Sequence, residues 1–192
     1  PKERADAVAL RKEITAPLYR EALDPANQQP LTPSMSQMIA ELLKRPSINK
    51  GSQEAQGLAL ERGDLPSAQG SMAGLHDVKQ SLDDQISSMK MSGENYKAGL
   101  IGNTKDMLMS TMDELNPLYR HANQAYRDAS QPINQMDVCQ ALYDKFVPAL
   151  ADQGGIPFRN TAQNYANALR NGDQVAKSAT GFKGATFENT MT

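Results

Sequence analysis

A heptad-like series of apolar residues runs through the second half of the chain. Its members are Ile101, Leu108, Met112, Leu115, Tyr119, Ala122, Tyr126, Ala129, Ile133, Met136, Tyr143, Val147 and Leu150. After a polar gap at Thr104 and Lys105, most steps are of four or three residues, and only Gln140 interrupts the series. This spacing places the apolar side chains on one side of a helix, so it predicts long helical segments that pack against other helices.

Helical spacing recurs on both sides of this series. It predicts further helices over residues 4–23, 33–45, 47–62, 73–91 and 159–169. The expected buried residues include Leu10 and Ile14 in the first helix and Leu58 in the third. No segment alternates between apolar and polar residues with a period of two, so no strands are expected. The predicted fold class is therefore all-α, an elongated multi-helix bundle with long, proline-kinked helices.

Prolines and glycines divide these segments. Pro17 and Pro117 are expected to kink their helices, because proline removes a backbone hydrogen bond, and Pro132 is expected to start a new helix. We expect one helical domain over residues 1–192, with a sub-boundary near 63–71 and a weakly ordered tail over 172–192. Since neither end carries a terminal motif, the chain is expected to be a piece of a longer protein.

Composition and charge narrow the classes of function. Aromatic residues make up only 5% of the 192 residues, whereas Met occurs ten times, which predicts a thin core of aliphatic side chains and Met. The net charge of −2 and the absence of a basic run disfavour nucleic-acid binding. No apolar run is long enough to span a membrane, and no secretion signal is present.

Few side chains suggest catalysis or metal binding. The two histidines, His76 and His121, are far apart in sequence and are interpreted as surface residues. Cys139 borders the apolar series and is interpreted as a small buried residue. Asp83 precedes a second aspartate, but adjacent helical residues diverge by about 100°, so a salt link from Lys79 is the expected role. We therefore expect no catalytic residues, no metal site and no cofactor.

One motif occurs twice. Residues 16–22 (APLYREA) are similar to residues 116–122 (NPLYRHA). A duplicated helical hairpin would make Tyr19, Arg20, Tyr119 and Arg120 candidate partner contacts. Chance, or similar proline chemistry used twice, explains the same similarity, and tyrosines on an apolar helix face are often core residues. Sequence alone leaves these alternatives open.

Several segments in a fixed order resemble a helical module of long tailed-phage and prophage proteins. The segments that carry the resemblance are Leu42–Pro46, Val78–Ile86, Pro117–Ala122 leading to Tyr126, and Gly181–Phe187 through Met191–Thr192. The resemblance implies a phage-encoded protein of several modules that is virion-associated or injected, without catalytic residues to carry over. The expected location is accordingly the bacterial cytoplasm or the phage virion.

The expected function is thus a non-enzymatic interaction or scaffold module of a phage or prophage protein. Its partners would be other protein modules of the same or another phage protein, or a second copy of the chain. The alternative is an accessory helical domain of a phage cell-wall-degrading enzyme whose catalytic part lies outside this chain.

Overall fold

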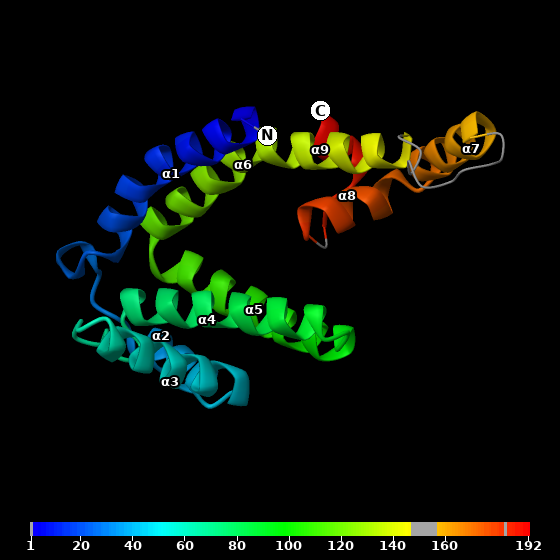
Figure 1. The fold of residues 1–192 in the computed structure, drawn as a ribbon. Coiled ribbons are helices and arrows are strands. Elements are labelled where there is room, and N and C mark those ends of the chain that lie inside the picture. The colour runs from blue at the N-terminus through cyan, green and yellow to red at the C-terminus, as the bar shows by residue number, and fades with distance from the viewer. Residues whose placement is uncertain (1, 147–156, 183) are drawn as a thin grey trace. The chain divides into compact units, whose positions relative to one another are not determined.

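The computed structural model describes residues 2–146, 157–182 and 184–192 (Figure 1). Every regular element in these ranges is helical, which confirms the all-α fold class. The elements are α1 (Lys2–Leu23), the short 3-10 helix η1 (Pro25–Asn27), α2 (Pro33–Leu43), α3 (Pro46–Glu61), α4 (Met72–Met91), α5 (Asn95–Leu115), α6 (Pro117–Phe146), α7 (Pro157–Arg170), α8 (Gly172–Thr180) and α9 (Phe187–Met191).

Local chemistry explains where these helices begin. The hydroxyls of Thr32 and Ser71 accept hydrogen bonds from free backbone N–H groups in the first turns of α2 and α4. Pro33, Pro46 and Pro117 are the first residues of their helices, where the missing N–H costs nothing. Because these caps and prolines can be recognised in the sequence, most of the predicted helix starts are close to the observed ones.

The three prolines within the helical segments behave differently from one another. Pro17 lies inside α1 and Pro132 inside α6, so the prediction that Pro132 begins a new helix is wrong. Before Pro117 the helix ends at Leu115, and Asn116 is extended, with φ −141° and ψ 104°. The proline ring disfavours helical backbone in the residue that precedes it. The apolar series is therefore divided between α5 and α6.

The chain forms two compact units. One unit consists of residues 15–124, and the other combines residues 1–14 with residues 125–192. Helices α1 and α6 thus contribute to both units. In the unit of residues 15–124, α4 packs against α3 and α5 (Figure 1). Its core consists of Ala22, Ile39, Leu42, Ile48, Met72, Leu75, Val78, Leu82, Leu108, Met112, Leu115 and Tyr119.

Among the described residues, the core of the other unit contains mostly small side chains. Its buried members are Val138, Leu142, Ala168, Ala176 and Ala185, which come from α6, α7, α8 and the segment before α9. The segment 172–192, expected to be weakly ordered, contains α8 and α9. The 63–71 segment, expected to be a boundary, connects α3 and α4 inside the unit of residues 15–124.

Some helices bury a different face from the predicted one. In α1, Leu10 is 57% exposed and Ile14 is 44% exposed, whereas Thr15 and Ala22 are buried. Polar contacts fix this rotation in the N-terminal half, because the Arg11 guanidinium stacks on a tyrosine ring of α6 and donates to a serine hydroxyl there. In α3, Leu58 is exposed, whereas Ile48 is buried.

The apolar series of α6 also turns outward along the helix. Tyr126 and Tyr143 are exposed, and Val138 and Leu142 are buried in their place. Cys139, expected to be buried, is exposed. Val147 and Leu150 lie outside the described residues. Within the described ranges, no helix combines the length and apolar character needed to cross a bilayer.

Candidate functional site

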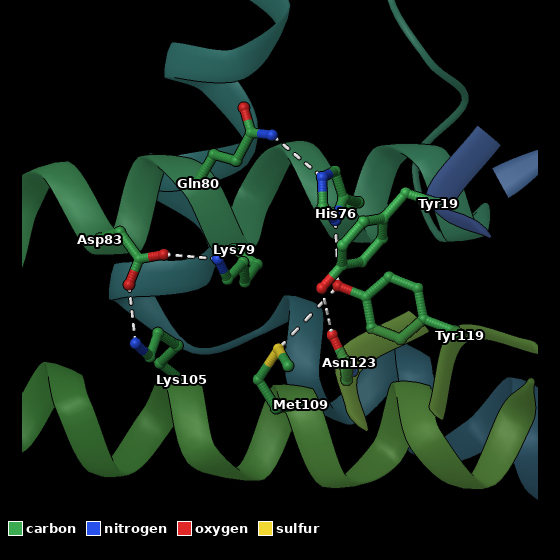
Figure 2. Close-up of polar contacts among 9 residues, drawn as sticks. All are labelled: Tyr19, His76, Lys79, Gln80, Asp83, Lys105, Met109, Tyr119 and Asn123. Atoms are coloured by element: carbon green, nitrogen blue, oxygen red, sulfur yellow. Dashed lines mark hydrogen bonds and ion pairs between the residues drawn. The ribbon is translucent and has the colours of Figure 1, made fainter. Parts of the chain in front are cut away.

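Three aromatic rings from distant parts of the sequence meet in the core of the unit of residues 15–124 (Figure 2). The ring centroid of Tyr119 lies 5.7 Å from that of Tyr19 and 5.8 Å from that of His76, both in edge-on geometry. The Tyr19 and His76 centroids are 5.4 Å apart. We call these three residues the His76 cluster. The two tyrosines are the equivalent residues of the repeated motif, which the fold has brought into contact.

A chain of hydrogen bonds passes through the imidazole. Nδ1 of His76 lies 3.0 Å from the Tyr119 hydroxyl, and Nε2 lies 2.9 Å from the amide nitrogen of Gln80. Because that amide nitrogen can only donate, Nε2 accepts and Nδ1 carries the proton that is donated to Tyr119. The Tyr119 hydroxyl in turn donates to the sulfur of Met109, at 4.0 Å. This arrangement requires a neutral histidine.

The surroundings of the cluster favour its uncharged forms. Burial lowers the pKa of His76, and the nearby charge of Lys79 lowers it further. Burial raises the pKa of Tyr119, whose side chain has no exposed surface. The interpretation of His76 as a surface residue is therefore wrong, whereas His121 is exposed as expected.

Tyr19 connects α1 to the cluster through a second set of polar contacts. Its hydroxyl donates to Oδ1 of Asn123 at 2.7 Å, and Nδ2 of Asn123 donates to Asp113 at 2.7 Å. Asn116 donates to the backbone carbonyl of Ala22 at 2.8 Å, while its own side-chain oxygen accepts from the first N–H groups of α6. These contacts connect the end of α1 to α6.

An ion cluster lies beside these rings on α4 and α5. Asp83 is 2.7 Å from Lys79, as the four-residue spacing predicted, and 2.7 Å from Lys105 of α5 (Figure 2). Burial alone would raise the pKa of Asp83, but hydrogen bonds to Lys105 and Lys79 outweigh it, so the pKa is lowered. The carboxylate therefore stays charged and joins the two helices.

The candidate partner contacts have different surroundings. Tyr119 is enclosed in the core and cannot present its ring to a partner in this fold, whereas Tyr19 is half-buried and Arg20 is exposed. The Arg120 guanidinium donates twice to the carbonyl of Asp113, at 3.1 and 2.7 Å. It thus caps the end of α5, which is a structural contact.

The contacts of the His76 cluster are structural. Both imidazole nitrogens are engaged, and the Tyr119 hydroxyl is enclosed. No three His, Cys, Asp or Glu side chains gather as a metal site in the part of the chain that the structure describes. The cluster holds α1, α4, α5 and α6 together. This role of His76 was not predicted from the sequence, although the repeated motif identified the two tyrosines that contact it.

An open groove between α2 and α5 is lined by both apolar and polar side chains. Its apolar lining includes Met38 and Leu42 of α2 and Met107 of α5. Polar residues form its borders, including Glu41 and Lys44, which are 2.7 Å apart, and also Arg45 and Glu114. We call it the α2–α5 groove. None of the candidate partner contacts lines it.

Comparison of the chain with protein-family models, curated proteins and solved structures gave no match.

Proposed function

We propose that this chain is a non-enzymatic helical interaction module of a phage or prophage protein, in which the α2–α5 groove binds a helix of another protein module. The phage origin is supported by the ordered sequence segments described above. The interaction role is supported chiefly by the groove, because it places partly exposed Met side chains between two helices with charged residues at its borders.

The lining of the groove suggests the kind of partner. Met38 and Met107 are both partly exposed, and Met side chains adapt their shape to an apolar surface. An amphipathic helix places apolar residues at intervals of three and four, which suits a groove between two helices. Because the borders carry both Glu41 and Arg45, the partner helix would carry charges of both signs beside its apolar stripe.

The proposal can be tested by measuring binding to purified proteins of known identity. Other modules of the same protein and the products of neighbouring genes would be purified and titrated against the chain by calorimetry. Replacement of Met38 or Met107 by Glu should weaken binding on the order of tenfold or more, since it places a charge in a desolvated contact. Asp106→Ala, an exposed change on the same helix as Met107, serves as the control.

The outcomes separate the alternatives. Unchanged affinity in both Met variants would overturn the groove as the binding surface. Concentration-dependent dimers that the Met variants abolish would identify the partner as a second copy. A lytic domain encoded beside this module would instead support the accessory domain of a cell-wall-degrading enzyme.

A further inference from the structure

His76 is the only histidine of the chain in a buried hydrogen-bonded setting, His121 being exposed. Its ring contacts Tyr19 of α1 and Tyr119 of α6, and both of its nitrogens are occupied. Protonation would add a second N–H, at Nε2, which would then face the amide nitrogen of Gln80. The new charge would also lie on a partly buried ring, where desolvation disfavours it.

Two carboxylates near His76, those of Asp77 and Asp83, would attract an imidazolium, but each already has other partners. On α4, Asp77 accepts a hydrogen bond from Ser67, Asp83 is held by two lysines, and Lys79 repels an imidazolium. From α5, the nearest carboxylate in the network is that of Asp113, which accepts from Asn123. From α1 and α6, the ring meets the tyrosines of the cluster.

The end of α1 buries few side chains completely. Within residues 15–23 only Thr15 and Ala22 are fully buried, while Tyr19 and Leu23 are partly exposed. By contrast, α4 buries several large aliphatic side chains against α3 and α5. Movement of the Tyr19 ring would uncover the part of the His76 ring that packs against α1.

We propose that His76 is an acid-sensitive latch whose protonation releases residues 15–23 of α1 from the His76 cluster. At neutral pH the uncharged imidazole, the two tyrosines and the Tyr19–Asn123 hydrogen bond hold this segment in place. At acidic pH the imidazolium is solvated once Tyr19 leaves. The segment would then be free while α3, α4 and α5 remain packed.

Nuclear magnetic resonance on the intact chain tests this proposal. The imidazole resonances of His76 would be followed from pH 8 to pH 5. Amide exchange would be measured over the same range and corrected for its intrinsic pH dependence. Exchange within residues 15–23 should accelerate as His76 titrates, by about tenfold for each unit that its pKa lies below 6.5. Amides of 75–89 should stay protected.

Two variants complete the test. His76→Gln keeps a polar side chain without a titratable group, so it should abolish the acid-dependent exchange of residues 15–23. Tyr19→Ala should raise the pKa of His76 toward the ordinary value for histidine, and it provides an independent readout if the first variant does not fold. The proposal is overturned if His76 protonates without faster exchange in residues 15–23, if exchange accelerates equally over 75–89, or if Tyr19→Ala leaves the His76 titration unchanged.

Discussion

Two glycines in neighbouring helices have opposite surroundings. A Cβ atom on Gly74 would lie 2.5 Å from the backbone carbonyl oxygen of Ala68, whereas nothing lies within 4 Å of a Cβ on Gly57. The first glycine allows the 63–71 segment to approach α4 closely. The second is an exposed helix position where glycine carries an entropic cost.

Alanine substitutions at these glycines should therefore shift stability in opposite directions. Gly74→Ala forces the backbone apart and should destabilise the chain by about 1–3 kcal/mol. Gly57→Ala should stabilise it by about 0.4–1 kcal/mol, since alanine restricts the unfolded chain more. Urea titration followed by circular dichroism measures both. Destabilisation at both positions would show that the contact with Ala68 is not the deciding factor.

Two residues of α5 that differ in burial should differ in how much their replacement lowers the free energy of unfolding. Leu108 has no exposed surface, and Asp106 on the same helix is exposed. Leu108→Ala should cost about 2–5 kcal/mol, from lost transfer free energy and the cavity that remains. Asp106→Ala should change the free energy of unfolding by within about 0.5 kcal/mol. Equal, small effects would mean that this face of α5 is not the core.

At the scale of elements, Asp83 joins α4 to α5 through Lys105. Asp83→Asn keeps the shape of the side chain but removes the charge that both lysines contact. Because the carboxylate is 36% exposed, we expect a loss of about 0.2–1 kcal/mol. The difference from wild type should shrink in 1 M salt, where charges are screened. A loss that is the same at low and high salt would indicate a hydrogen-bonding role instead.

The contact between α8 and α9 depends on another glycine. A Cβ on Gly172 would lie 2.9 Å from Cγ of Phe187, so the ring packs directly on the backbone of α8. Gly172→Ala should displace the ring and increase amide exchange in residues 187–191. Phe187→Ala should produce the same local change by removing the ring. Protection in α4 and α5 should be unaffected by either variant, and loss of it there would contradict a local effect.

At the scale of the whole molecule, three groups make stability depend on pH on the acid side of neutrality. The pKa of His76 is lowered, chiefly by burial, and that of Glu54 is lowered, chiefly by a hydrogen bond from Ser81. The pKa of Asp83 is lowered by its lysines against the effect of burial. In each case the unfolded chain binds more protons than the folded chain between the two pKa values. Stability must therefore fall as the pH falls.

The expected profile has two stages. Between pH 8 and about 6.5 these groups leave stability constant, and it should begin to fall below about 6.5 as unfolded His76 takes up a proton. A second loss should follow below about 4.5, where the carboxylates titrate in the unfolded chain. Urea titrations at each pH measure both stages. His76→Gln should remove only the first stage, and an unchanged first stage in that variant would contradict its assignment to His76.

Much of the secondary structure could be predicted from the sequence, because helices depend on local interactions. The cap at Thr32, the first-position proline at Pro33 and the spacing of Met and Leu in α2 act within one or two turns. The salt link between Lys79 and Asp83 follows from the same geometry. Its second arm, to Lys105, joins two helices and could not be predicted from spacing.

The sequence by itself thus determined the all-α fold class and most helix bounds, since spacing and caps fix the backbone locally. The tertiary structure decided which faces are buried. In α1 the contacts of Arg11 with α6 turn Leu10 and Ile14 to the exterior, although both are apolar. It also decided that Tyr19, His76 and Tyr119 form one cluster, because burial and hydrogen-bond partners depend on segments that are distant along the chain and meet only in the folded state.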